Sequence, residues 1–120
     1  IQYTHARIRT IIRKSKKINI ESNQNINAEY NFEPKEVSVL KLLHDYPGIT
    51  KQAAVSLSPA LVANYAYELA KEYNQFYHEV VILKETEETK RNFRVALSKL
   101  TGNTLKSSMA LLGIQVPERM

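Results

Sequence analysis

The segment that follows Ser58-Pro59 restricts the fold of this 120-residue chain more than any other feature. Serine accepts hydrogen bonds from the free N–H groups of a first helical turn, and proline fits the first helical position, so the pair predicts a helix start. From there to about Val81, apolar residues recur at helical spacing on one face, which consists of Val62, Tyr65, Leu69, Tyr73, Phe76 and Val80. The segment therefore predicts one long helix with a core-facing stripe.

Three further helices are predicted on the same grounds, over about residues 2–17, 36–46 and 87–112. Pro47-Gly48 is expected to end the second of them, and one or two short helical turns are expected between residues 50 and 56. The chain holds only three Gly and four Pro, and alternation typical of strands is scarce. We therefore predict a single all-α domain over residues 1–120, a helical bundle of four to five helices.

The remaining segments give weaker indications. Residues 19–35 contain five Asn and are predicted to form a long loop, which Tyr30 and Phe32 could anchor. In the last helix Gly102 is expected to cost about 1 kcal/mol relative to Ala, and Gly113 suits a left-handed C-terminal cap. The core face of that helix is predicted to consist of Phe93, Leu97, Leu100 and Leu111.

The positive charge of the chain is concentrated in its first helix. The formal net charge is +5, yet residues 1–18 hold six basic residues and no acidic one, and the other 11 basic residues face 12 acidic ones. At 100° per residue, isoleucines form one face of this helix, and the opposite face holds Arg7, Arg9, Arg13, Lys14 and Lys17, with Tyr3 among them. Cations neutralise phosphates and aromatic rings stack on unpaired bases, so this face is suited to nucleic-acid binding, although a basic helix face is more often an ordinary solvated surface.

Several other classes of function are disfavoured. The chain has no Cys, which excludes disulfides and thiolate metal sites, and no Gly-rich phosphate loop. Its single Asp, Asp45, adjoins His44 on a predicted helix, where neighbouring side chains point in different directions. His5, His44 and His78 lack the spacing of a helical metal site. The apolar runs are too short to span a membrane and no signal peptide opens the chain, so we expect a cytoplasmic protein.

Three segments resemble one protein family. Residues 1–14 (IQYTHARIRTIIRK) are similar to the start of the C-terminal domain of arginyl-tRNA synthetases, and residues 58–78 (SPALVANYAYELAKEYNQFYH) to its long central helix. Residues 111–120 (LLGIQVPERM) resemble the C-terminus of that family. Their order and spacing fit over nearly the whole chain, whereas residues 19–35 carry no resemblance.

The resemblance implies an anticodon-binding domain of the DALR type, from a class I aminoacyl-tRNA synthetase. It implies that the chain is the C-terminal part of a larger arginine–tRNA ligase, whose separate catalytic domain uses ATP, with Mg, to attach arginine to its tRNA. The His-x-Gly-His and Lys-Met-Ser-Lys-Ser motifs of that domain are absent from this sequence. The expected partners are therefore the anticodon stem and loop of arginine tRNA and the catalytic domain of the same polypeptide. No enzyme activity, cofactor or metal is expected for the chain on its own.

The resemblance also assigns residues. Tyr3, Arg7, Tyr77 and Met120 match family positions that contact anticodon-loop bases or close the base pocket. Supporting contacts to the RNA backbone are expected from Arg9, Arg13, Lys14, Lys17, Asn74 and His78. Some members carry a further aromatic residue where this chain has Val81, so one stacking platform is missing here or another side chain replaces it.

One alternative stays open at this point. The basic helix could dock an acidic protein partner or another domain, which would make the chain a helical protein-interaction module. Substitution of Tyr3 and Tyr77 by alanine separates the two hypotheses, because only base stacking needs both rings.

Overall fold

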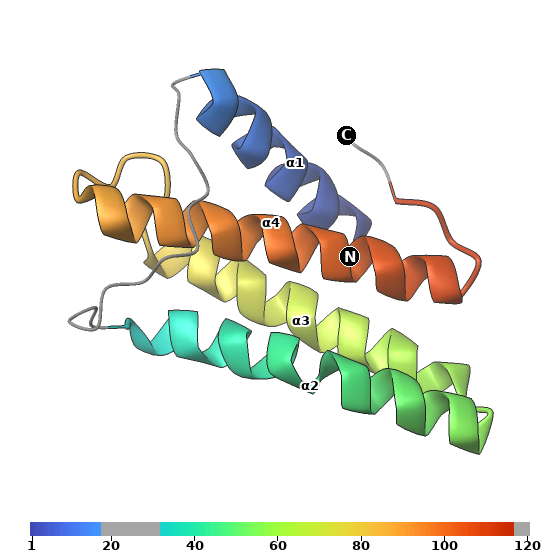
Figure 1. Cartoon of the computed structure of the whole chain (residues 1–120). Coiled ribbons are helices and arrows are strands. Elements are labelled where there is room, and N and C mark those ends of the chain that lie inside the picture. The colour runs from blue at the N-terminus through green and yellow to red at the C-terminus, as the bar shows by residue number, and fades with distance from the viewer. Residues whose placement is uncertain (18–31, 117–120) are drawn as a thin grey trace.

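The computed structural model describes residues 1–17 and 32–116, which form four helices. Their bounds are Gln2–Lys17 (α1), Pro34–Ser56 (α2), Pro59–Glu79 (α3) and Glu88–Leu111 (α4). The helices α2 and α4 both pack against α3, and α1 lies across α4 on the side away from α2 (Figure 1). The all-α prediction is thus confirmed, with four helices and no strand in the described part.

The central helix α3 provides most of the predicted core. Its buried residues include the predicted stripe of Val62, Tyr65, Leu69, Tyr73 and Phe76, while Val80 is partly buried beside them. Pro59 occupies the first turn as expected, but the Ser58 side chain makes no capping hydrogen bond. The buried hydroxyl of Tyr73 donates to Ser98 Oγ at 2.7 Å, and burial raises the pKa of this phenol. Tyr73 therefore belongs to the core and stays neutral at physiological pH.

The prediction that Pro47-Gly48 ends the second helix is wrong. The helix α2 continues through Pro47 to Ser56, and Thr50 Oγ1 donates to the Pro47 carbonyl at 2.9 Å. A helical proline costs about 3 kcal/mol, and packing along α3 on both sides of Pro47 offsets that cost. The Tyr46 ring, for instance, stacks on the Tyr65 ring with centroids 5.3 Å apart.

The helix α2 also begins earlier than predicted, at Pro34 rather than at residue 36, because Glu33 and Glu36 form a capping box. Phe32 contacts the Phe93 ring edge-on, with ring centroids 5.4 Å apart, so this residue is itself held on the core. Tyr30 and most of the predicted loop over residues 19–35 lie outside the described residues.

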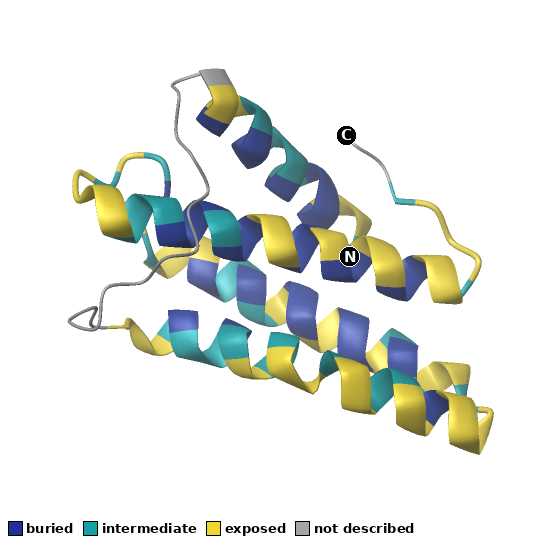
Figure 2. Cartoon of the chain, in the orientation of Figure 1, coloured by how far each residue is buried: buried dark blue, intermediate teal, exposed yellow. Residues whose placement is uncertain are grey.

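The core face of α4 differs from the predicted one. Phe93 and Leu97 are buried, but Leu100 and Leu111 are exposed, and the core instead receives Val95, Leu105 and Met109. Figure 2 shows buried and exposed positions alternating along α4. The buried face also carries Ser98, Thr101 and Ser108, whose hydroxyls donate to the carbonyl four residues earlier at 2.7–2.8 Å. Hydroxyl groups satisfied by their own helix can be buried, so counting apolar residues alone misplaces this face.

Gly102 lies where α1 approaches α4 closely. A Cβ atom added to Gly102 would come within 2.8 Å of Ile8 Cγ2, and Ile8 is completely buried. Gly102 therefore has a packing role besides its predicted cost in helix propensity, because the missing side chain makes room for α1. Gly113 follows α4 with a φ of 75°, as predicted for a left-handed cap.

Candidate nucleic-acid interface

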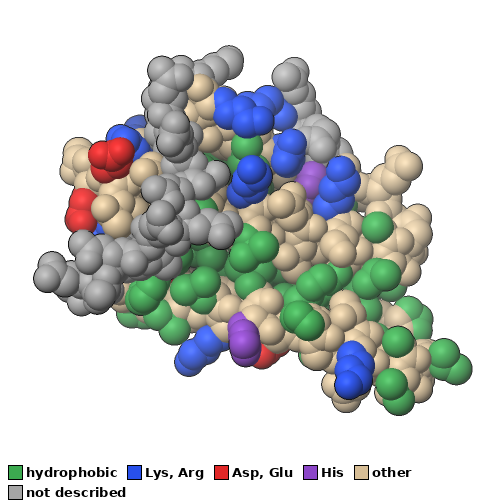
Figure 3. All heavy atoms as spheres, in the orientation of Figure 1, with side chains coloured by type: hydrophobic (Ala, Val, Ile, Leu, Met, Phe, Trp, Pro, Cys, Tyr) green, Lys and Arg blue, Asp and Glu red, His purple; other side chains and the backbone are tan. Residues whose placement is uncertain are grey.

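The helix α1 presents one continuous face to a cavity of about 550 Å³, a volume within the usual range of small-ligand pockets. The α1 residues that line it recur at helical spacing and are Tyr3, Ala6, Arg7, Thr10, Ile11 and Lys14. The apolar edge of α1, which includes Ile11, fixes the helix on the core, and the polar side chains next to it point into the cavity. Lys and Arg side chains gather over α1 in Figure 3.

The opposite wall comes from the end of α3 and the loop between α3 and α4, which we call the α3–α4 loop (residues 80–87). The helix α3 ends at Glu79, and Val80 has an extended backbone with φ −123° and ψ 130°. The consecutive β-branched residues Val80, Val81 and Ile82 disfavour a further helical turn. Residues 80–84 then line the cavity, and Ile82 is buried in the core.

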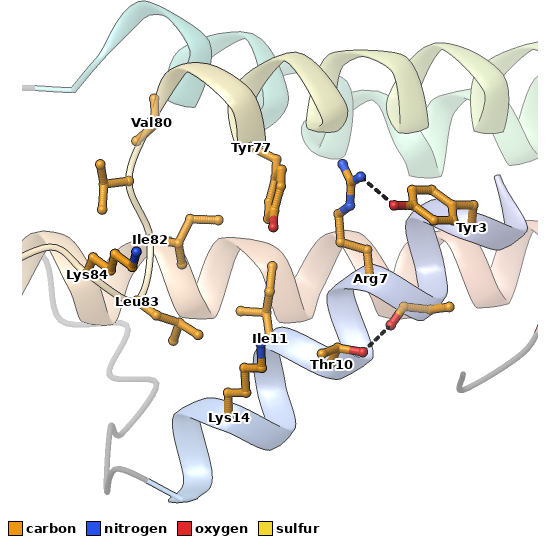
Figure 4. A pocket seen from close by; sticks show the side chains of 12 residues that line it. Tyr3, Arg7, Thr10, Ile11, Lys14, Tyr77, Val80, Ile82, Leu83 and Lys84 are labelled. Carbon is orange, nitrogen blue, oxygen red and sulfur yellow. Dashed lines mark hydrogen bonds between the residues drawn. The ribbon is translucent and has the colours of Figure 1, made fainter. Parts of the chain in front are cut away.

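Tyr77 lines this cavity between Arg7 and the α3–α4 loop. Figure 4 shows the Tyr77 ring with Arg7 on one side and the side chains of Val80 and Ile82 on the other. The Arg7 guanidinium lies over the Tyr77 ring at 4.3 Å, so one face of the ring is covered. The other face of the ring is turned toward the α3–α4 loop. We call the space between the Tyr77 ring and the α3–α4 loop the slot. Its walls are an aromatic ring on one side and aliphatic side chains on the other.

The guanidinium of Arg7 is held by neutral partners. It lies 4.6 Å from the centroid of the Tyr3 ring, and its Nη2 donates to the Tyr3 hydroxyl at 2.7 Å. Its Nη1 makes a long contact of 3.5 Å with Asn74 Oδ1. The positive charge is thus oriented by aromatic rings and an amide, none of which neutralises it. Arg7 stays available to an anion or to an acceptor on a base edge.

Asn74 ties α1 to α3 behind Arg7. Its Nδ2 donates to Thr4 Oγ1 at 3.0 Å, and Thr4 is 2% exposed. The structure therefore places Asn74 where it fixes Arg7, and its predicted contact with the RNA backbone stays a prediction.

The other predicted contact residues are distributed unevenly. Lys14 is exposed at the slot, whereas Arg9 and Arg13 do not line the cavity, and Arg13 Nη2 donates to Thr10 Oγ1 at 3.0 Å. His78 packs edge-on against Tyr77 at 5.6 Å but lines a separate cavity of about 330 Å³ with Tyr67 and Asn74. The Lys17 side chain and Met120 lie outside the described residues.

Apart from Val81, the sequence interpretation missed the α3–α4 loop as part of this site. Lys84 joins Arg7 and Lys14 at the cavity, and no carboxylate lies among its lining residues in the described part. The run from Val80 to Leu83 was visible as an apolar segment, but the prediction placed its start inside the helix. The resulting arrangement suits a flat group between the walls of the slot and negative charge at its rim.

The described residues contain neither a membrane-spanning helix nor a cluster of metal ligands. No described helix combines the length and apolar character that a membrane crossing requires. Within the same residues, no group of three or more His, Asp and Glu side chains could hold a metal ion.

The chain is similar to arginine–tRNA ligases in sequence and in structure. Those of Phocaeicola vulgatus and Flavobacterium psychrophilum are 46% and 48% identical over 120 residues, which is all of this chain and 20% and 19% of theirs. The structure of Thermus thermophilus arginyl-tRNA synthetase superposes with a TM-score of 0.85 at 28% identity, over 99% of this chain and 20% of that one. The chain thus spans about a fifth of the length of these relatives.

The family match covers residues 1–120, which includes both walls of the slot. We conclude that the chain belongs to the DALR anticodon binding domain family.

Proposed function

We propose that this chain binds the anticodon stem and loop of arginine tRNA, and that the slot receives an unpaired base of the anticodon loop. The observation that carries the proposal is the Tyr77 ring, which has one face covered by Arg7 and the other turned to the slot. A base inserted there would stack on the phenol ring and contact aliphatic side chains on its other side. Sequence-specific RNA recognition commonly uses splayed-out bases in this manner.

The cations around the slot support an RNA ligand. Lys14 and Lys84 approach the slot from α1 and from the α3–α4 loop, and each ammonium can pair with a phosphate. The absence of carboxylates among the described lining residues leaves this charge uncompensated. Phosphate contacts position the RNA and do not read its sequence. Lys14 and Lys84 are therefore assigned to affinity rather than to selectivity.

Arg7 is the residue best placed to read a base. Its guanidinium is oriented by Tyr3, Tyr77 and Asn74, so little side-chain freedom has to be lost when RNA binds. Its donors can reach acceptors on a base edge, which a lysine ammonium does with less geometric selectivity. Tyr3 is more than half exposed and offers a second ring beside Arg7. The contact proposed for Met120 concerns a residue outside the described part.

Attachment of arginine to tRNA with ATP belongs, in this proposal, to the larger part of the ligase beyond this chain. A cytoplasmic location follows from the same assignment. The alternative of a protein-interaction module gains no support from the slot, because a protein partner needs no opening of this shape between a tyrosine and a loop.

Binding of arginine tRNA and of a transcript with a changed anticodon tests the proposal. We expect the folded 120-residue chain to prefer the unaltered anticodon, and its affinity to fall with rising salt because phosphate contacts release counterions. Equal affinity for both transcripts would contradict base recognition. Salt-independent binding would contradict the phosphate contacts.

A further inference from the structure

Arg94 is a buried cation that joins three parts of the molecule. It lies on α4 and is 4% exposed. Its Nε donates to Glu36 Oε2 at 3.4 Å, and its Nη1 donates to Glu85 Oε2 and to the Val81 carbonyl, both at 2.8 Å. A guanidinium in such a place is stable only when its donors are satisfied, so these contacts determine where its partners lie.

One of these partners is fixed in the body of the bundle. Glu36 is completely buried in the first turn of α2, and its Oε1 accepts a hydrogen bond from the Glu33 backbone N–H at 2.8 Å. The same carboxylate therefore caps α2 with one oxygen and contacts Arg94 with the other. Arg94 is thereby anchored to a rigid element at its Nε side.

The other two partners belong to the α3–α4 loop. The Val81 carbonyl and the Glu85 carboxylate both accept from Nη1 of Arg94, and Glu85 Oε1 also accepts from the Glu87 backbone N–H at 3.2 Å. Residues 80–84 of this loop form the wall of the slot that faces Tyr77. Nη1 of Arg94 thus holds this wall directly, because the Val81 carbonyl oxygen belongs to the backbone of the wall.

We infer that Arg94 is a positioning residue for RNA binding, because it sets the distance between the α3–α4 loop and the Tyr77 ring. This inference rests on the proposed function of the slot. Arg94 is buried and does not line the cavity, so it acts through the loop and not by touching the RNA. A loop already held in place spares the RNA the cost of ordering it, which raises affinity for a stacked base.

Glu85 allows the role to be tested without disturbing the anchor at Glu36. Glu85→Ala removes the side-chain acceptor in the loop, whereas Glu85→Gln keeps one oxygen that can accept from Arg94. Glu87→Ala is the matched control, since it removes an equal charge from the same loop. Among the described contacts, the Glu87 side chain makes only an ion pair with Lys90 at 3.6 Å. The measurements are affinity for arginine tRNA, urea unfolding, and the fluorescence of 2-aminopurine placed in the anticodon loop.

We expect Glu85→Ala to bind the tRNA about two- to tenfold more weakly than Glu87→Ala, as expected when RNA must order a loose segment. Glu85→Gln should recover part of the loss, which a pure charge effect would not allow. At saturating protein, 2-aminopurine should be less stacked in Glu85→Ala than in the control. This last readout does not depend on affinity or on overall stability.

Two results overturn these ideas separately. Anticodon-selective binding that is equal in Glu85→Ala and Glu87→Ala, with equal 2-aminopurine fluorescence, overturns the positioning role alone. Wild-type binding that ignores the anticodon overturns the proposed function, and the positioning role with it.

Discussion

Arg7 and Arg94 occupy opposite kinds of surroundings in the same small bundle. Arg7 is half-buried between two tyrosine rings, and its hydrogen-bond partners in the described part are neutral. Arg94 is 4% exposed and lies between the carboxylates of Glu36 and Glu85. Neutral partners orient a charge and leave it available, whereas carboxylates neutralise it. The first arginine is thus suited to a ligand and the second to holding the protein together.

Substitution of Arg94 should give the largest effect on stability. Arg94→Met leaves Glu36 buried without its cationic partner, and breaking a buried ion pair in this way costs about 3–5 kcal/mol. Urea unfolding followed by circular dichroism measures the loss. The double variant Glu36→Gln/Arg94→Met should be more stable than Arg94→Met, because the buried charge is removed while the amide oxygen can still cap α2. A double variant no more stable than the single one would contradict the ion-pair explanation.

Substitution of Arg7 should show the reverse pattern. Arg7→Met is expected to weaken binding of arginine tRNA by about 1–3 kcal/mol and to relax anticodon selectivity, as for other arginines that read a base. Its free energy of unfolding should change by no more than about 2 kcal/mol, because two cation–π contacts of about 0.5–1 kcal/mol each are lost. Arg9→Met on the same helix removes an equal charge away from the slot and should leave selectivity intact. Equal loss of selectivity in both variants would assign recognition to charge alone.

A substitution at Gly102 should disturb the surroundings of Arg7 by pushing α1 away from α4. Gly102→Ala gains about 1 kcal/mol of helix propensity, but its Cβ would lie 2.8 Å from the stiff Ile8 side chain, beside Arg7. Overpacking of this kind typically costs about 1–3 kcal/mol, so we expect a net loss of stability near 1 kcal/mol. Amide hydrogen exchange should rise in α1 and stay unchanged around Arg94. A stabilised variant would show that α1 can shift freely at this position.

The pH dependence of stability should give the smallest effect. The hydrogen bond from the Glu87 N–H, together with the Arg94 guanidinium, lowers the pKa of Glu85 below its ordinary value of 4.5. A lowered pKa in the folded state adds stability above the unfolded pKa, and this contribution is lost as the pH falls through the folded pKa. Glu85→Gln should therefore unfold with a weaker pH dependence below about pH 4.5. Glu87→Gln should keep the steeper dependence of the wild type.

Much of the fold followed from sequence patterns, because most of the bundle obeys simple helical periodicity. The stripe on α3 was predictable since its buried positions are nearly all large and apolar. Pro47 gave a wrong boundary because packing of α2 on α3 outweighs a local penalty. The core face of α4 includes buried hydroxyl residues such as Thr101 and leaves Leu100 exposed. A prediction based on apolar residues alone could not identify this face.

Helical spacing predicted only one wall of the site, whereas Tyr77 and Val81 of the other wall were assigned by the family resemblance. Tyr3, Arg7 and Lys14 share a helical face, so their grouping could be foreseen from spacing. The position of the α3–α4 loop could not be foreseen from spacing, because it depends on Arg94 of α4 and on Glu36 of α2. Only the family resemblance grouped Tyr77 with Tyr3 and Arg7, because Tyr77 is far from Arg7 along the chain and spacing does not connect them.

Replacement of Tyr77 tests the central claim most directly, with Tyr67 as a matched control. Both are exposed tyrosines on α3, but only Tyr77 lines the slot. The measurement is the dissociation constant of Tyr77→Ala and Tyr67→Ala for arginine tRNA. We expect Tyr77→Ala to bind about 5- to 150-fold more weakly, the loss of one stacked base, and Tyr67→Ala to bind like the wild type. Equal affinities of the two variants, with both folded, would contradict the binding of an anticodon base in the slot.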